Sequence, residues 1–535
     1  MNERLVEDWL TKANERSFQT PFAQALLAEG MQVLRVGHSS HEHGKDIIAI
    51  DKGGRIHAYQ LKDGDLDLNA YEKGLAQLNA LVETQVEHPA ITGQPKHQPW
   101  LVISGKVSIP TEDRIRVHNA AWQKRRYTPL KLMTGMQLQA KFNSMAANFW
   151  PQKPEESRSL LSLYLADGKS TLDRGAFAKL IAGVVVTKGA PPKTEVGRRL
   201  AAANLFASYA LSPFYTVENH WEVVQGWTLT AAHIAWAADN AKLESKAWQP
   251  TFRLAVEAAL GALDSLVSEA LQPRALGPGP FCELDEITRA RCTICAGAIA
   301  AKLLVTLKAG KEWDSTEQAT KAIEDLFKSG RFILWGESAI PFFLTSVWAL
   351  DETRGNQLSD GILLSLISAI CATNCSRLPI KLASPYESAD EANARVFRPR
   401  FEGEAVRSLQ AAASHALSPL VTIAARRLWR NFLASRWSQI TKIDAVQLTP
   451  DRPRDLLLWD WGHERGTDQS RRFSAPQSWS ELLREARVDD SQELPRVLTE
   501  NFDFSLLFLL CFPHRLFRPL VKYLDAAVHD RPLLS

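Results

Sequence analysis

Three polar residues on two neighbouring predicted strands have the types and the spacing of a catalytic site. Asp46 opens the predicted strand 46–51, and Gln60 and Lys62 end the predicted strand 55–62. A tight Gly-containing turn between the strands makes them antiparallel, so the start of the first lies beside the end of the second. Gln60 and Lys62 are two residues apart, and their side chains therefore share one face of the sheet. One carboxylate, one amide oxygen and one ammonium are expected to converge there.

These residue types suit the hydrolysis of a phosphodiester with the help of a divalent metal ion. Asp46 supplies a charged oxygen, Gln60 a neutral one and the backbone carbonyl of Leu61 a third, and oxygens are the ligands of Mg²⁺ and Mn²⁺. Such an ion polarises the phosphate and lowers the pKa of water. Lys62 would orient or deprotonate that water and offset charge in the transition state. The alternative is a solvated ion pair between Asp46 and Lys62, worth about 0–1 kcal/mol.

The elements around these residues form an α/β order that fits within one domain. A helix ending at Gly30 precedes three antiparallel strands, and helices then alternate with two further strands. The nearly continuous apolar run 99–104 is typical of a buried central strand. Strands are predicted over 31–36, 46–51, 55–62, 99–104 and 129–134, and helices over 5–14, 17–29, 69–87, 111–126 and 135–142.

Over roughly residues 15–145 the sequence resembles the PD-(D/E)xK nuclease superfamily, and within it the Mrr-like restriction endonucleases. That branch typically carries Gln in place of the acidic residue of the motif. The resemblance implies a restriction-endonuclease-like fold, Asp46, Gln60 and Lys62 as the active site, Mg²⁺ or Mn²⁺ as cofactor and DNA as substrate. It rests on the segments FQTPFAQALLAEGMQV (18–33), GKDIIA (44–49), YQLK (59–62) and LVISG (101–105).

The first helix departs from the family pattern. The family usually has a glutamate immediately after the Phe of this helix, whereas Gln19 follows Phe18 here. Glu15, one turn earlier, could stand in for that acid. Two alternatives to a metal-dependent endodeoxyribonuclease stay open, and the departure at Gln19 favours the first of them. One is an inactive nuclease-like adaptor that binds nucleic acid or protein, and the other is a helical interaction protein whose first domain only helps assembly.

The chain beyond the predicted linker 151–159 is rich in Ala, Leu, Arg and Trp at helical spacing, without a repeat of fixed length. A large, mostly α-helical region is therefore predicted, with domains at 1–150, 151–280 and 281–535. The resemblance implies an effector of prokaryotic restriction or antiphage defence, in which the helical region senses, targets or assembles. An ATPase or a DNA-binding subunit is then the expected partner, and a homodimer is also open because cutting two strands often uses paired active sites.

The composition is that of a soluble globular protein, with 45% hydrophobic and 23% charged residues. A net charge of +3 is too mild to indicate nucleic-acid binding by itself. Six cysteines in 535 residues suggest a reducing compartment, so we expect a cytoplasmic protein. The most apolar run, 504–512, is shorter than the ~20 residues that span a bilayer. It is predicted to be a buried core segment, with no membrane partner.

Several weaker signals have an ordinary structural interpretation beside the functional one. Two basic stretches could contact phosphates, but helix ends that obey the helix dipole and amphipathic helices give the same patterns. Two cysteine pairs have zinc-like spacing, although buried cysteines in helices are common. The histidines of one loop could add a metal ligand, and are more often solvated. The first basic stretch contains Arg114, Arg116, Lys124, Arg125 and Arg126, and the second contains Arg426, Arg427, Arg430 and Arg436. The cysteine pairs are Cys292 with Cys295 and Cys371 with Cys375, and the loop histidines are His38, His41 and His43.

Overall fold

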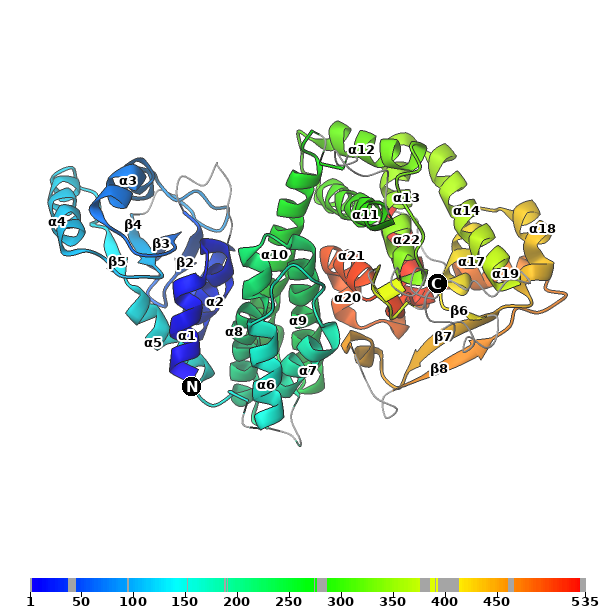
Figure 1. The fold of residues 1–535 in the computed structure, drawn as a ribbon, viewed down its shortest axis with the longest axis horizontal. Coiled ribbons are helices and arrows are strands. Elements are labelled where there is room, and N and C mark those ends of the chain that lie inside the picture. The colour runs from blue at the N-terminus through cyan, green and yellow to red at the C-terminus, as the bar shows by residue number, and fades with distance from the viewer. Residues whose placement is uncertain are drawn as a thin grey trace, which may run out of the picture. The chain divides into compact units, whose positions relative to one another are not determined.

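The computed structural model divides into two compact units, Met1–Ala262 and Leu263–Ser535, whose elements are labelled in Figure 1. The division falls within helix α10 (Ser245–Ala270). The predicted domain limits at 150 and 280 stay predictions. The structure describes residues 2–36, 45–93, 96–151, 153–186, 189, 191–273, 275–276, 286–375, 385–389, 391–392, 413–459 and 466–529.

A five-stranded mixed sheet, in the order β1-β2-β3-β4-β5, organises the beginning of the first unit (Figure 1). The first three strands pair antiparallel, and β3, β4 and β5 pair parallel. An α/β N-terminal part with a mixed sheet is thus confirmed, including the antiparallel meander of its first three strands. The strands are β1 (Gln32–Val36), β2 (Ile47–Ile50), β3 (Ile56–Lys62), β4 (His97–Ile103) and β5 (Lys131–Met133).

Helices cover both faces of this sheet. On one face, α3 and α4 pack side chains such as Leu78 and Trp122 against Ala58 and Leu101 of the sheet in one apolar cluster. The next strand residue, Tyr59, points to the opposite face and meets Phe22 of α2 edge to face, with ring centroids 5.3 Å apart. The helices are α1 (Asn2–Lys12), α2 (Glu15–Ala28), α3 (Leu68–Glu83), α4 (Ile109–Lys124) and α5 (Gly135–Ala146).

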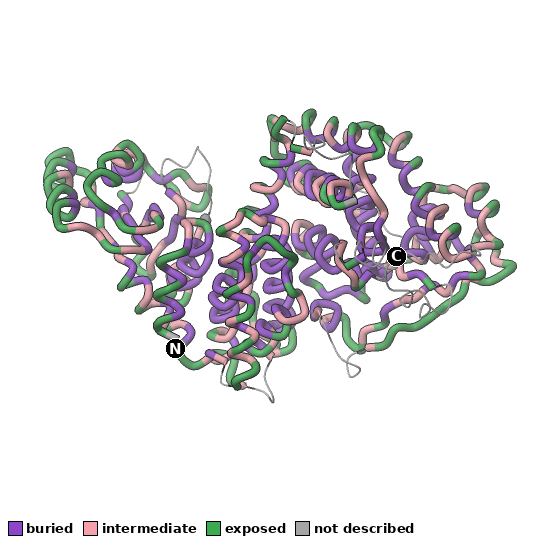
Figure 2. The backbone as a smooth tube through the Cα atoms, viewed as in Figure 1, coloured by how far each residue is buried: buried purple, intermediate pink, exposed green. Residues whose placement is uncertain are grey.

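A helical bundle completes the first unit and packs on α2. Asn204 of the bundle donates a hydrogen bond to Gln24 of α2 (2.9 Å) and another to the carbonyl of Thr251 (3.1 Å). Most residues of α8 and α9 are buried, as the purple colouring of these helices in Figure 2 shows. Helix α2 therefore carries side chains to the sheet on one side and to the bundle on the other. The bundle helices are α6 (Pro154–Tyr164), α7 (Arg174–Val185), α8 (Lys193–Thr216), α9 (His220–Asn240) and α10.

The second unit is mostly helical, as predicted, but it also contains a three-stranded sheet that helical spacing did not predict. Its strands are β6 (Ala413–Ser414), β7 (Asp444–Pro450) and β8 (Gly466–Arg471). Strand β8 (GTDQSR) is mainly exposed, so it lacks the apolar alternation that identifies a strand. The α-helices are α11 (Glu286–Lys308), α12 (Thr316–Lys328), α13 (Ile340–Arg354), α14 (Asn356–Cys375), α17 (Leu417–Arg426), α18 (Arg430–Ile440), α19 (Trp479–Arg487), α20 (Arg496–Glu500), α21 (Phe502–Cys511) and α22 (Arg518–Val528). Short 3₁₀ helices occupy Glu337–Ala339, Pro453–Leu457, Ser491–Glu493 and Pro513–Arg515.

Among the residues that the structure describes, the second unit contains short apolar helices, such as α21, and two longer ones. Helix α21 contains all but the last residue of the apolar run 504–512 that is predicted to be core, and every residue from Phe504 to Phe512 is buried. Two helices are long and apolar enough to cross a membrane by length and composition, Ile287–Lys308 and Gln357–Cys375. The first is 67% buried within the protein, as a core helix of the same composition would be. The expected absence of a membrane partner stays a prediction.

Candidate active site

The side chain of Asp46 continues the pairing of β2 with β3 where the backbone pairing ends. The backbone N–H of Asp46 donates to the carbonyl of Tyr59 (2.8 Å), beside the last paired residues Ile47 and Tyr59. The Asp46 carboxylate then accepts a 2.7 Å hydrogen bond from the N–H of Leu61. Since the N–H and C=O of a strand residue point to the same side, the Leu61 carbonyl faces the side on which Asp46 lies. The carboxylate and this carbonyl are thus neighbours.

Gln60 lies on the strand directly before Leu61 and is 3% exposed. Its amide Nε2 donates to Oε1 of Gln77 in α3, at 3.0 Å. Its Oε1 is buried and has no hydrogen-bond partner among the described residues. An unsatisfied buried acceptor costs about 1–3 kcal/mol, and an ion or water is the usual explanation for one. Gln60 therefore presents an oxygen that a cation would satisfy.

Lys62 forms an ion pair with Glu15, the first residue of α2, with 2.9 Å between Nζ and Oε1. Both side chains are about one-third exposed. Burial raises the pKa of Glu15, and Lys62 opposes that shift, while the nearby carboxylates of Asp46 and Asp63 add to it. Glu15 consequently lies within electrostatic reach of Asp46 as well as in contact with Lys62. The structure brings this predicted helper to the predicted site.

Gln19, one helical turn after Glu15, is also at the site, in a different role. Its side chain is buried, and its Nε2 donates to the backbone carbonyl of Asp46 at 3.3 Å. A glutamate at this position would have no proton to donate to that carbonyl. Gln19 thus holds the backbone of Asp46 in place, while Glu15 provides the acidic group on α2.

Together these groups offer oxygen ligands of the kind that Mg²⁺ binds. The set comprises the Asp46 carboxylate, the Gln60 amide oxygen and the Leu61 carbonyl. Mg²⁺ is commonly held by one or two carboxylates with the remaining positions filled by water or substrate. Within the described ranges, no three His, Cys, Asp or Glu side chains gather as a group that could hold a metal ion. Neutral oxygens must therefore share in any binding here, and the orphaned oxygen of Gln60 fits that need.

Sequence reasoning did not single out Lys45, the residue directly before Asp46. Its side chain is 3% exposed, and Nζ has no hydrogen-bond partner in the part of the chain that the structure describes. Burial lowers the pKa of this lysine to about 8, although Glu87 opposes the shift. The sequence feature that could have identified Lys45 is its position just before an apolar strand, where one face of the strand is expected to be buried.

The basic residues predicted to contact nucleic acid in α4 are partly engaged with acidic neighbours. Arg114 pairs with Glu72 (2.7 Å) and Arg125 with Glu83 (2.7 Å), both across to α3. Arg116 also has an acidic partner, one turn away on its own helix. These pairs reduce the positive charge that α4 presents to a phosphate. The nucleic-acid role of these three residues, and of Lys124 and Arg126, stays a prediction.

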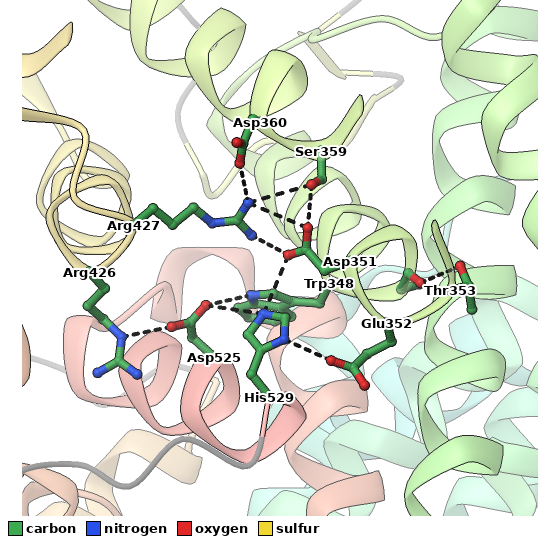
Figure 3. A network of polar contacts seen from close by, with 11 residues as sticks. Trp348, Asp351, Glu352, Thr353, Ser359, Asp360, Arg426, Arg427, Asp525 and His529 are labelled. Carbon is green, nitrogen blue, oxygen red and sulfur yellow. Dashed lines mark hydrogen bonds and ion pairs between the residues drawn. The ribbon is translucent and has the colours of Figure 1, made fainter. Parts of the chain in front are cut away.

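Two arginines of the second basic stretch belong to a buried ion-pair network (Figure 3). Arg426 pairs with Asp525 of α22 at 2.7 Å. Arg427 pairs with Asp351 of α13 and with Asp360 of α14, the latter at 2.6 Å. The arginine side chains are only 8% and 6% exposed. They join the end of α17 to three other helices of the second unit, α13, α14 and α22, and do not offer a surface for phosphates.

The paired cysteines are free thiols. Burial raises the pKa of Cys295 to about 12 and that of Cys371 to about 11, so both stay protonated at neutral pH. Zinc binds thiolates, and these surroundings favour the neutral thiol of a helical core. The three histidines His38, His41 and His43 lie outside the described residues.

Comparison of the chain with protein-family models, curated proteins and solved structures found no match. The resemblance to Mrr-like nucleases therefore stays a prediction from the sequence motifs.

Proposed function

We propose that the N-terminal domain is a Mg²⁺- or Mn²⁺-dependent endodeoxyribonuclease of the PD-(D/E)xK type. The observation that carries the proposal is the bond from the Leu61 N–H to the Asp46 carboxylate. It fixes an acid against the strand segment that bears Gln60 and Lys62. The motif formed by Asp46, Gln60 and Lys62 and the α/β fold with its mixed sheet also support this proposal.

Each residue then has a role that follows from its contacts. Asp46, the Gln60 oxygen and the Leu61 carbonyl would hold the ion, which supplies Lewis acidity toward the scissile phosphate. Lys62, kept in place by Glu15, orients the attacking water and offsets negative charge in the transition state. The raised pKa of Glu15 brings this carboxylate closer to neutral pH, which suits a proton acceptor. The water oxygen bonds to phosphorus while its proton passes to Glu15, and the bond from phosphorus to the leaving sugar oxygen breaks as that oxygen takes a proton from solvent.

Recruitment by another component is part of the proposal. The net charge of +3 is small, and three of the five basic residues expected to contact DNA pair with acids. Affinity for DNA depends on cations that replace counterions on phosphates. A partner subunit, such as an ATPase or a DNA-binding protein, would supply the missing affinity in a cytoplasmic restriction or antiphage defence system. The helical region would make that contact.

The second candidate is an adaptor with a nuclease-like fold and no turnover. Gln19 favours it, because the first helix lacks the family acid and uses the position to donate to the Asp46 carbonyl. Metal affinity separates the two candidates. Titration of the full chain with Mn²⁺ should show binding that weakens at least about tenfold in Asp46→Ala and Gln60→Ala if the site is a nuclease centre. Unchanged affinity in both variants would favour the adaptor.

A further inference from the structure

One histidine of the second unit, His529, lies among three carboxylates (Figure 3). It is the residue directly after α22, and its side chain is only 8% exposed. The ring Nδ1 lies 2.8 Å from Oε1 of Glu352 in α13. The ring Nε2 lies 3.4 Å from Asp351, also in α13, and 3.9 Å from Asp525 in α22. Each nitrogen of this ring therefore faces an acid.

This arrangement calls for a proton on both nitrogens of the His529 ring. A neutral imidazole has one N–H group and one acceptor nitrogen, whereas both nitrogens donate in the charged ring. In the neutral form, a lone pair would face either Glu352 or Asp351. Burial opposes the charged ring, but the neighbouring carboxylates outweigh burial and raise the pKa of His529 above its ordinary value. Geometry and electrostatics thus both favour the imidazolium.

The two buried acids near His529 also have arginine partners on α17. Arg426 pairs with Asp525, and Arg427 pairs with Asp351 as well as with Asp360 of α14. Arginine stays charged at every pH at which a protein is folded. Loss of the proton from the histidine consequently leaves these pairs in place, and α22 remains attached to α17.

The last turn of α22 has different ties to its neighbours. His529 binds Glu352 of α13, and Lys308 of α11 donates a 2.9 Å hydrogen bond to the carbonyl of Ala527. Cations at these places also suit the C-terminal end of a helix dipole. The lysine contact is exposed, whereas the histidine contact brings in the buried ring. Histidine is the side chain whose charge changes near neutral pH, so the attachment of this turn depends on pH.

We propose that His529 is a pH-sensitive latch that holds the last turn of α22 against α13. The protonated ring binds Glu352 and Asp351, and loss of its proton releases the turn while the arginine pairs keep the rest of α22 in place. The inference does not depend on the nuclease assignment, because all of these residues belong to the second unit.

The direction of the pH effect follows from the raised pKa of His529 in the folded protein. The folded state binds the proton more tightly than the unfolded state, whose histidine has a pKa of about 6.5. The latch therefore contributes fully below about pH 6.5, and its contribution is lost as the pH rises through the folded pKa.

Hydrogen exchange of the full chain between about pH 6 and pH 9 tests the proposal. Protection factors are compared, because they remove the intrinsic pH dependence of exchange. Protection of the last turn of α22 should fall at least about tenfold over this range, whereas α12, which lies outside the network, should keep its protection. In His529→Gln, the turn should already be poorly protected at pH 6. Constant protection in the unmodified chain, or equal protection of the two proteins at pH 6, would overturn the proposal.

A change on the partner side provides a second variant with a matched control. Glu352 is about one-third exposed, so Glu352→Gln should fold. It removes one of the charges that favour the imidazolium, and the midpoint of the loss of protection should move to lower pH by at least about half a unit. Glu312→Gln, at an exposed position before α12, should leave the midpoint unchanged. The same midpoint in Glu352→Gln and in the unmodified chain would contradict the latch.

Discussion

The carboxylate of Asp46 accepts a 2.7 Å hydrogen bond from the backbone N–H of Leu61, the residue between Gln60 and Lys62. The last paired residues of β2 and β3 are Ile47 and Tyr59, and two residues beyond Tyr59 the Asp46 side chain takes the place of a backbone acceptor. Asp46 lies directly before β2, and its carboxylate is positioned by a hydrogen bond from β3. This relation joins the metal-binding and lysine halves of the proposed centre.

Replacement of Glu15 by Gln tests whether the Glu15–Lys62 contact supports the chemistry. The change removes the charge that holds the Lys62 ammonium, and DNA cleavage should fall about tenfold to a hundredfold. Stability should change by less than about 1 kcal/mol, because the pair is partly exposed. Initial rates of plasmid nicking and urea denaturation measure the two effects. Glu29→Gln, at the other end of α2, is the matched control; equal rates for both variants would exclude a role for Glu15.

Replacement of Gln19 by Glu restores the family acid and tests the role of this position. Without metal, the buried carboxylate faces the Asp46 carbonyl and cannot donate to it, so the melting temperature should fall by several degrees. Mg²⁺ should recover the loss, because the added carboxylate becomes a further ligand. Melting curves with and without Mg²⁺ give the comparison. A loss that Mg²⁺ leaves in place would show that position 19 does not face the ion.

Replacement of Lys45 by Met should stabilise the protein at pH 7. The folded state lowers the pKa of Lys45 to about 8, whereas the unfolded value is about 10.4. The folded state thus binds fewer protons between these values, and stability of the unmodified chain rises with pH in that window. The advantage of Lys45→Met should therefore shrink from about pH 8 to pH 10. Urea denaturation at several pH values measures the stability of Lys45→Met, with the exposed Lys73→Met as control. A lower stability of Lys45→Met than of the unmodified protein at pH 7 would contradict the prediction.

Replacement of Arg427 by Met should strongly destabilise the second unit. It removes Arg427 from the buried carboxylate of Asp351 and leaves His529 as the remaining partner, and the loss of one partner of a buried ion pair costs about 3–5 kcal/mol. The double variant Arg427→Met with Asp351→Leu should recover much of the stability. Arg472→Met removes an exposed pair and should cost less than about 1 kcal/mol. Denaturation curves of the three variants decide the matter, and similar losses in both single variants would argue against a structural network.

Strand alternation and the antiparallel turn were sufficient to predict that Asp46 lies against the strand segment 60–62, where its carboxylate contacts the Leu61 N–H. A turn of fixed length sets the register of an antiparallel pair, and residues two apart must share a face. The pairing of Glu15 with Lys62 was harder to predict, because it depends on how α2 lies across the sheet. The same limit explains Gln19, whose side chain meets a backbone atom 27 positions away. No spacing rule reports such a contact.

Charge partners and exposed strands were also beyond the sequence patterns. The partner of Arg114 is Glu72, 42 positions earlier, and helix packing alone brings the two together. Arg426 and Arg427 form part of a basic run in the sequence, yet both are buried in ion pairs with distant acids. Strand β8 is polar because it is exposed. Clusters of basic residues and the periodicity of apolar residues in a sequence therefore do not predict features that arise only from tertiary packing.

Cleavage of supercoiled plasmid by the full chain in Mg²⁺ or Mn²⁺, with any recruiting partner present, is the most direct measurement of the central claim. The unmodified protein should nick or linearise the DNA, and chelation of the metal should stop it. Asp46→Asn and Lys62→Met should each lower the rate at least about a hundredfold, whereas the exposed controls Asp113→Asn and Lys73→Met should retain it. Cleavage at equal rates by Asp46→Asn, Lys62→Met and the unmodified protein would contradict a nuclease centre at this site.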